Sequence, residues 1–305
     1  MKETIHCSIG VIENNSNYLL LRRQKSPYYN YFEFPGGKIK KNEQPIEALQ
    51  RELLEELDIL TEKVSFIHSI THEYKEFSVC LYVYRIINYK GKIKSNYKQE
   101  YIYCGKDFFK KIKCLESTYR IIKLLSLPRF LSISKPNHKT LEQDLEKIKI
   151  KENFFMRLRN INGFYKNNSD KIPYISKICE KKNLSLIIDH PFEKKYYLHC
   201  DGVHYKSDFL KSIKNLPNDF KYYSCSCHNI NEIKKANLLN FDYIVISPIR
   251  EAKVLNQEPL GWDKFKKFSI YANMPTFALG GVSKDDFKLS TKNKGYGVAG
   301  IRNFW

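Results

Sequence analysis

Residues 37–59 read GKIKKNEQPIEALQRELLEELDI, which is a glycine turn, a single glutamate and then an Arg-Glu-Leu-Leu-Glu-Glu run. Glu52, Glu55 and Glu56 stand at positions i, i+3 and i+4, so their carboxylates are expected on one face of a helix. An apolar stripe occupies the opposite side, with Ile46, Leu49, Leu53 and Leu57. Like charges one turn apart repel each other. We therefore expect Mg²⁺, with Mn²⁺ as an alternative, because oxygen-only ligands suit these hard ions.

The alternative is a solvated glutamate face on a surface helix, which is common in lysine-rich and glutamate-rich sequences. The flanking residues argue against it. Gly36 and Gly37 allow the main chain to approach a ligand closely, and Pro45 suits the first turn of the following helix. A strand-like stretch from Tyr31 to Phe34 precedes the glycines. The sequence thus predicts a strand, a loop and a helix that carries the acidic face.

This spacing resembles the signature of the Nudix hydrolases at every position but one, where the family has glycine and this chain has Asp58. We expect Asp58 to adopt the left-handed conformation at the helix end, with a small effect on stability. The resemblance implies an α/β/α sandwich and a divalent metal. It assigns Glu52, Glu55 and Glu56 as catalytic metal ligands, together with a carbonyl of Gly37, the carboxylate of Glu43, and Arg51 as the residue that orients a glutamate.

Within that family the MutT-type enzymes look similar, on the residues Leu19–Arg23 and Phe32–Ile39. They hydrolyse oxidised purine nucleoside triphosphates such as 8-oxo-dGTP. The resemblance implies Arg22, Arg23, Phe34 and Ser117 as substrate-binding residues, with a solvated strand end as the alternative for the two arginines. The family's base-binding asparagine is absent from residues 114–118, where Ser117 or Glu116 would replace it. Glu100 is a candidate general base if its loop shifts.

The rest of the first domain alternates in the manner of a sheet. We expect strands at residues 4–11, 18–23, 64–74 and 77–87, a turn at 14–17, and a closing amphipathic helix at 116–125.

Pro128 marks a change of pattern, and we place the domain boundary there, with domains at residues 1–127 and 128–305. Eight short apolar runs follow, with helical stretches between them. They span residues 130–134, 154–158, 185–189, 202–204, 221–224, 242–247, 276–279 and 297–301. This pattern predicts a (β/α)₈ TIM-type barrel. The sequence stops at Trp305, so we expect the last helix to be lacking.

Several of these pieces resemble the thiamine-phosphate synthase and TenI family. They are residues 201–204 (DGVH) with Asp208, 226–229 (SCHN), 241–244 (FDYI), 278–282 (ALGGV) and 297–301 (GVAGI). The resemblance points to a thiamine-phosphate-like ligand in the barrel. Gly280 and Gly281 suit a backbone phosphate cradle, with Asp208 nearby, although a plain tight turn is the equal alternative.

The synthase chemistry of that family is degraded in this chain. The Gln-x-Arg-x-Lys strand becomes residues 157–161 (RLRNI), which keep one arginine. The Asn-Asp pair after the third strand becomes Asp189-His190, which removes one expected Mg²⁺ ligand. The Thr-x-Thr-Lys loop becomes residues 250–254 (REAKV). Three losses at separate places predict a barrel that binds a ligand without catalysis.

The composition limits the partners. The chain has 305 residues and a net charge of +19, but the lysines are scattered over loops, so we expect a small nucleotide substrate and no stable nucleic-acid complex. No apolar stretch is long enough for a membrane span and no signal peptide is visible, which predicts a cytoplasmic protein without membrane contact. The eight dispersed cysteines predict free thiols, and Cys225-Ser-Cys227-His228 is interpreted as a core strand that enters a loop rather than a zinc site.

The sequence therefore predicts a Mg²⁺-dependent nucleoside triphosphate pyrophosphohydrolase of MutT type, acting in nucleotide-pool sanitation, with a non-catalytic barrel. Two alternatives stay open. The Nudix chemistry could act on thiamine-related or other diphosphates, or the chain could be bifunctional with an active synthase.

Overall fold

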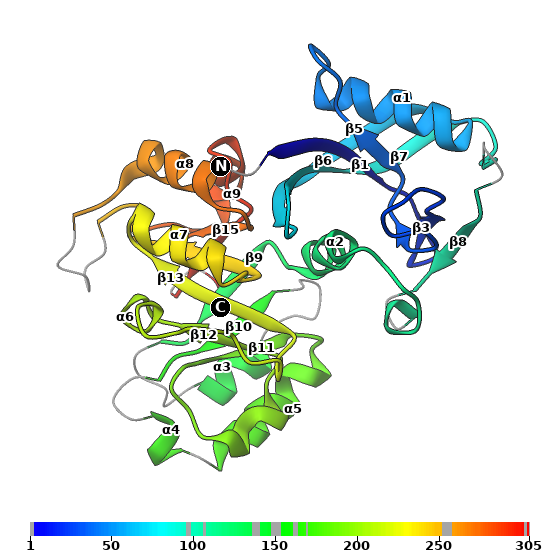
Figure 1. The fold of residues 1–305 in the computed structure, drawn as a ribbon. Coiled ribbons are helices and arrows are strands. Elements are labelled where there is room, and N and C mark those ends of the chain that lie inside the picture. The colour runs from blue at the N-terminus through cyan, green and yellow to red at the C-terminus, as the bar shows by residue number, and fades with distance from the viewer. Residues whose placement is uncertain are drawn as a thin grey trace. The chain divides into compact units, whose positions relative to one another are not determined.

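The computed structural model describes residues 3–95, 99–105, 108–135, 141–147, 154–160, 164–168, 170–251, 258–301 and 304. The chain divides into two compact units, Met1–Ser126 and Leu127–Trp305, which are described separately below (Figure 1).

Unit 1 contains two four-stranded sheets. The first has the order β5-β1-β7-β6, where β1 (Thr4–Val11) runs parallel to β7 (Ser78–Lys90) and antiparallel to β5 (Gly36–Lys38), and β6 (Leu60–Glu73) pairs with β7 as a long hairpin. The second joins β2 (Glu13–Asn14), β3 (Asn17–Arg22), β4 (Phe32–Glu33) and β8 (Tyr101–Cys104). The strands and the turn expected in this region are confirmed, although β6 and β7 are longer than the sequence indicated.

Helix α1 (Pro45–Leu57) begins with a proline in its first turn and buries Ala48, Leu49, Leu53 and Leu57. The three leucines form one core with residues of the neighbouring strands and connections, which are Ile12, Leu19, Leu21, Ile59 and Ile86. The Ser8 hydroxyl donates to the Pro45 carbonyl at 2.6 Å and ties the start of the helix to β1. The apolar stripe predicted from the sequence is therefore the buried face, and the acidic residues are left on the other side.

Two backbone conformations place the helix against the sheet. Gly36 has a φ of +133°, and a Cβ at this position would lie 2.1 Å from the Ser8 carbonyl oxygen, so only glycine fits. Asp58 has a φ of 57° and donates its N–H to the Leu54 carbonyl. Aspartate thus provides the left-handed helix end for which the family uses glycine.

Helix α2 (Glu116–Ser126) closes unit 1, as expected, and buries Ile121 and Leu124. A short 3₁₀ turn, η2 (Phe108–Lys111), precedes it. Alternate residues of β1 point to opposite faces of the first sheet. On one face a Cβ on Gly10 would contact Leu53 of α1. On the other face Cys7 and Ile9 line the same pocket as Ile121 of α2. The two helices therefore cover opposite faces, which is the predicted α/β/α sandwich.

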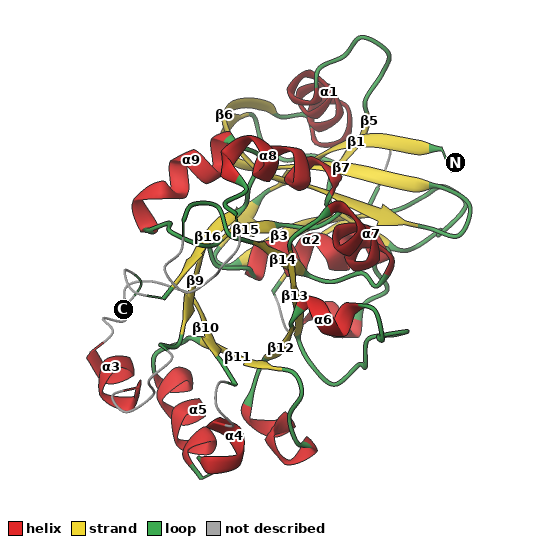
Figure 2. Cartoon of the chain, turned by 90° about the vertical axis from the view of Figure 1, so that its left-hand side faces the viewer, coloured by secondary structure: helices red, strands yellow, loops and turns green. Residues whose placement is uncertain are grey.

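Unit 2 is a closed barrel of eight parallel strands in the order β10-β11-β12-β13-β14-β15-β16-β9 (Figure 2). All eight predicted strands are confirmed, with small shifts at their ends. They are β9 (Phe130–Ile133), β10 (Phe155–Leu158), β11 (Ser185–Asp189), β12 (Gly202–Tyr205), β13 (Tyr222–Cys227), β14 (Tyr243–Ile246), β15 (Thr276–Ala278) and β16 (Gly297–Gly300).

Large aromatic side chains fill the inside of the barrel. Phe155 stacks on Tyr243 with ring centroids 5.2 Å apart and meets Tyr222 edge-on at 4.8 Å, and Tyr243 in turn contacts Phe277 at 5.2 Å. The described helices lie around the strands. They are α3 (Leu141–Lys147), α4 (Phe164–Asn167), α5 (Lys171–Lys181), α6 (Ser207–Leu210), α7 (Ile230–Leu238), α8 (Gly261–Tyr271) and α9 (Phe287–Lys292), with the 3₁₀ turns η3 (Lys194–His199) and η4 (Lys284–Asp286).

Cys225 and Cys227 are buried in β13, so this motif is a core strand, as interpreted from the sequence. All eight cysteines are free thiols. Within the described ranges no helix has the length and apolar character that crossing a membrane requires.

The left-handed Asp58 gives a direct test of the helix end. Asp58→Gly is expected to change the free energy of unfolding of unit 1 by less than about 1 kcal/mol. Asp58→Val is expected to cost about 1–2 kcal/mol, because a β-branched residue resists positive φ. Urea denaturation of the three proteins measures both differences, and equal stability of the valine and glycine variants would contradict this account of the helix end.

Candidate active site

The acidic face of α1 opens into a pocket of about 1070 Å³ in unit 1. The pocket runs from Glu52, Glu55 and Glu56 past Gly36 and Gly37 to residues of β1, β7 and α2. Among the residues predicted from the sequence, Gly37, Glu52, Glu55, Glu56, Arg23, Phe34 and Ser117 line it. The structure thus brings the three glutamates together in one cavity with three of the four expected substrate-binding residues.

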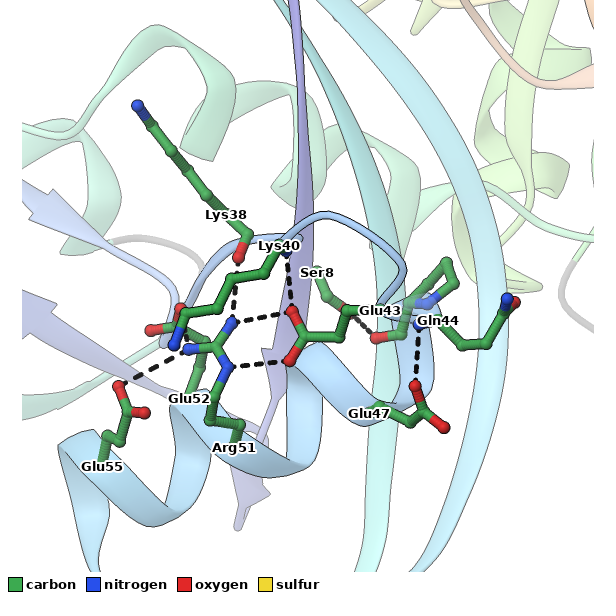
Figure 3. Close-up of polar contacts among 10 residues, drawn as sticks. Ser8, Lys38, Lys40, Glu43, Gln44, Glu47, Arg51, Glu52 and Glu55 are labelled. Atoms are coloured by element: carbon green, nitrogen blue, oxygen red, sulfur yellow. Dashed lines mark hydrogen bonds and ion pairs between the residues drawn. The ribbon is translucent and has the colours of Figure 1, made fainter.

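Arg51 lies at the centre of the polar contacts on the helix (Figure 3). Its Nε and Nη2 donate to the two carboxylate oxygens of Glu43 at 2.8 and 3.0 Å, and its Nη1 donates to Glu52 at 2.6 Å. Nη1 also lies 3.5 Å from a carboxylate oxygen of Glu55. One guanidinium therefore holds three carboxylates in place, and it bonds the Lys38 carbonyl in addition.

Glu43 is fully engaged in this arrangement. Both of its oxygens bond Arg51, and one also accepts the backbone N–H of Lys40 at 2.8 Å. These hydrogen bonds, with the one from Arg51 as the larger cause, lower the pKa of the Glu43 carboxyl to about 2. The structure places Glu43 beside Arg51 and outside the pocket lining, so it is disposed to orient the arginine rather than to reach a ligand in the pocket.

Glu56 has the opposite electrostatic environment. Burial raises the pKa of its carboxyl to about 8, and the neighbouring carboxylates of Glu52 and Glu33 add to the shift, against a hydrogen bond of 2.9 Å from the Gly36 N–H. A buried carboxyl that resists ionisation, with two further carboxylates near it, is suited to a cation. Gly37 packs closely against Glu52: a Cβ at this position would lie 2.4 Å from the Glu52 carboxylate carbon, so a larger residue would displace that carboxylate.

The described residues contain no preformed group of three His, Cys, Asp or Glu side chains with the geometry of a metal site. The cause is visible in the contacts: Glu52 and Glu55 turn to Arg51, and Glu56 turns to the Gly36 amide. The oxygen-donor set, the mutual repulsion and the raised pKa of Glu56 still fit a hard divalent cation.

Glu33 was not singled out from the sequence. It lies in the pocket and receives two bonds from Arg23 Nη1, at 3.1 and 3.2 Å, while Arg23 Nε donates to the Pro27 carbonyl. Burial raises the pKa of the Glu33 carboxyl in spite of Arg23. Glu33 stands between Phe32 and Phe34 in a short stretch that the sequence indicates as a strand, so the pattern marks it as part of that strand and not as a candidate site residue.

Arg22 and Glu100 lie apart from this cavity. They pair with each other at 2.7 Å, with side chains 41% and 54% exposed, and neither lines the pocket. The structure thus assigns the pocket to the second of the two predicted arginines, and Gln99 rather than Glu100 lies on its wall.

The part of the pocket beside the connection between β6 and β7 is aromatic. The ring of Tyr74 stacks on Phe77 with centroids 5.0 Å apart and lies 5.9 Å from Tyr28, and all three line the cavity. The Tyr74 hydroxyl donates to Ser117 Oγ at 2.9 Å. These aromatic residues were not identified from the sequence, because they lie in two loops that only the fold brings together.

The barrel residues proposed for phosphate follow two different strands. Asp208 is exposed on α6 after β12, whereas Gly280 and Gly281 follow β15, and β13 and β14 separate these strands. Gly281 faces Arg250, which bonds the Gly281 carbonyl and pairs with Asp286. Of the replaced loop at residues 250–254, only Arg250 and Glu251 fall among the described residues.

Residues 4–105 match the NUDIX domain family, and residues 132–304 match the thiamine monophosphate synthase family. The chain belongs to the thiamine monophosphate synthase family. It carries a NUDIX domain ahead of the barrel, so both resemblances read from the sequence are confirmed.

The curated relatives are similar either to the NUDIX domain or to the barrel. A thiamine-phosphate synthase of Prochlorococcus marinus is 30% identical over 185 residues, which is 60% of this chain and 52% of that protein, so the chain spans about half of that relative's length. An 8-oxo-dGTP diphosphatase of Proteus vulgaris is 31% identical over 94 residues, 30% of this chain and 84% of that protein. A solved thiamine phosphate pyrophosphorylase of Pyrococcus furiosus is 16% identical, with a TM-score of 0.44 over 57% of this chain and 85% of that one.

The raised pKa of Glu56 predicts a specific dependence of stability on pH in the metal-free NUDIX domain. In the unfolded chain this carboxyl titrates near 4.5 and in the folded domain near 8. The folded state therefore holds the extra proton, and the stability that Glu56 contributes is complete below pH 4.5 and lost as the pH rises through 8. Glu56→Gln should flatten this decline and be more stable than the wild type at pH 8 in EDTA. Denaturation of both proteins between pH 4.5 and 8 measures it, with the exposed Glu76→Gln as control. The same slope in Glu56→Gln and wild type would contradict the assignment.

Arg51 provides a second prediction. Arg51→Lys keeps the positive charge but loses the planar guanidinium that bonds Glu43 and Glu52 at the same time. The rate of diphosphate hydrolysis by the NUDIX domain is therefore expected to fall by about 10–100-fold, with little change in the thermal unfolding midpoint. The matched control is Arg85→Lys, because Arg85 forms an exposed pair with Glu13 outside the pocket. Steady-state rates and thermal denaturation of both variants check it, and equal activity of Arg51→Lys and wild type would refute a positioning role.

Proposed function

We propose that the NUDIX domain is a Mg²⁺-dependent nucleoside triphosphate pyrophosphohydrolase that prefers oxidised purine nucleotides such as 8-oxo-dGTP, and that it acts in nucleotide-pool sanitation. The observation that carries the proposal is one cavity that is lined by carboxylates and by an aromatic wall. The carboxylates would hold the metal ion that binds the triphosphate, and the aromatic wall would stack on the nucleobase. The cavity of about 1070 Å³ is large enough for such a ligand.

In this reaction water attacks a phosphorus atom of the triphosphate, the anhydride bond breaks, and the nucleoside monophosphate and pyrophosphate leave. A bound Mg²⁺ would screen the phosphate charge and polarise the bridging oxygen. Glu52, Glu55 and Glu56 would hold it, with the Gly37 carbonyl beside them.

The protein's own residues provide the remaining steps. Arg51 keeps Glu52 and Glu55 oriented, and Glu43 keeps Arg51 in place. Arg23, Lys25 and Lys38 line the pocket and supply positive charge for the phosphate oxygens.

The base would lie between Phe34 and the aromatic wall formed by Tyr28, Tyr74 and Phe77. Ser117 carries a hydroxyl in this part of the pocket that already accepts one hydrogen bond from Tyr74, so its own hydrogen can point toward an acceptor on the base. The asparagine that MutT-type enzymes use is thus replaced by a Tyr74–Ser117 pair.

Parallel hydrolysis of four compounds tests the substrate class. We expect the full-length protein with Mg²⁺ to hydrolyse 8-oxo-dGTP with a kcat/KM at least about tenfold above dGTP, ADP-ribose and thiamine diphosphate. Glu56→Gln should lose about 10²–10⁴ in rate while keeping its fold. Comparable rates on all four compounds would rule out the MutT-type assignment.

The match of residues 132–304 to the thiamine monophosphate synthase family supports a second candidate, in which the NUDIX domain acts on thiamine-related diphosphates or the barrel retains synthase activity. The hydrolysis assay with thiamine diphosphate tests the first of these alternatives, and complementation of a thiamine-requiring bacterium that lacks its synthase tests the second. We expect no growth, and growth that depends on the barrel would establish the bifunctional alternative.

A further inference from the structure

A buried ion pair lies in the barrel where β10 and β11 end. Arg157 Nε donates to Asp189 Oδ1 at 2.7 Å, and the two side chains are only 6% and 0% exposed. The backbone N–H of Asn160 approaches Asp189 Oδ2 at 3.4 Å. Both oxygens of this carboxylate therefore have donors from the chain itself.

The surrounding residues fix the pair. The Tyr165 hydroxyl accepts the backbone N–H of Asp189 at 2.6 Å and donates to the Leu158 carbonyl at 2.7 Å, so it joins the ends of the two strands. Tyr165 is itself buried. A buried carboxylate with a well-placed guanidinium and satisfied hydrogen bonds is stable, whereas a buried carboxylate without its partner is strongly unfavourable.

The side chain of His190, the residue after Asp189, provides no oxygen ligand for a metal ion. His190 stands where the synthase family has an aspartate ligand, and its ring packs among Tyr205, Phe209 and Phe192 with centroid distances of 4.7, 5.0 and 6.2 Å. An imidazole in an aromatic cluster is a poor ligand for Mg²⁺, which prefers oxygen. Mg²⁺ therefore does not fit the residues present at this end of β11.

A second arginine–carboxylate pair lies beside the glycine turn. Arg250 places both nitrogens of its fork on Asp286, at 2.7 and 3.0 Å, and Nη1 also donates to the Gly281 carbonyl at 3.2 Å. The glycine turn and the arginine thus bind each other and Asp286.

We infer that the residues at the ends of β10 and β11 do not fit a divalent cation: Arg157 already gives Asp189 a positive partner, the His190 side chain provides no oxygen ligand, and this described part of the barrel does not bind Mg²⁺. An anionic ligand at this end of the barrel is then bound without a metal. The inference concerns the barrel alone and stands independently of the function proposed above.

Hydrogen–deuterium exchange of the full-length protein, in excess MgCl₂ and in EDTA, tests it region by region. We expect Mg²⁺ to leave exchange in β10, β11 and α6 unchanged. The α1 peptide of the same sample reports separately on the NUDIX domain, so failure of one proposal is distinguishable from failure of the other. Slower exchange of the β10 and β11 peptides of the wild type in Mg²⁺ would overturn the inference.

Arg157→Gln extends the test. Without its guanidinium, Asp189 should gain affinity for the metal, and Mg²⁺ at ten times its Kd should slow exchange in β10 and β11 by about tenfold. Lys177→Gln is the control, because Lys177 is an exposed cation of α5, and it should gain no response. A folded Arg157→Gln variant whose β10 and β11 peptides do not respond to Mg²⁺ would show that Arg157 is not what keeps the metal from Asp189, and would overturn the inference. If that variant does not fold, the wild-type measurement decides: Mg²⁺ protection of the wild-type β10 and β11 peptides contradicts the inference, and unchanged exchange supports it.

Discussion

The contact between Arg51 and the carboxylates of α1 is the constraint on which the NUDIX site depends. A helix that buries Leu49, Leu53 and Leu57 must turn its glutamates to the other side, where they repel one another. One guanidinium relieves this repulsion for Glu43, Glu52 and Glu55. Glu56 accepts a hydrogen bond from the Gly36 amide, and burial raises the pKa of its carboxyl. A divalent cation beside Glu56 would lower this pKa again, because it would stabilise the ionised carboxylate.

The barrel shows the other solution to the same problem. There, Arg157 satisfies Asp189 completely inside the fold, and Arg250 satisfies Asp286 beside the glycine turn. Charges that have partners in the chain make a stable structure but leave no electrostatic demand for a ligand. Glu56 has two carboxylates near it and accepts its hydrogen bond from an uncharged backbone amide, whereas Asp189 has a guanidinium, and this contrast is the physical reason why we propose that the chemistry of this chain lies in the NUDIX domain.

The sequence predicted those features that depend on local spacing. The acidic face, the Pro45 start, the left-handed Asp58 and all eight barrel strands follow from periodicity and backbone preference, and these expectations are confirmed. Contacts across the fold could not be read in this way. The pairing of Arg23 with Glu33 joins adjacent strands, and Tyr28, Tyr74 and Ser117 meet from three separate segments. Arg157 and Asp189 looked like two independent losses of family residues, whereas in the fold each compensates for the other.

The most direct test of the central claim is the binding of Mn²⁺ to the full-length protein, followed by electron paramagnetic resonance, in the wild type and in Glu56→Gln. If the Glu56 carboxylate of the NUDIX domain is what attracts the metal, the wild type will bind Mn²⁺ and release protons on binding near pH 7, and the Glu56→Gln variant will lose both signals. Equal Mn²⁺ binding by the two proteins would contradict the account.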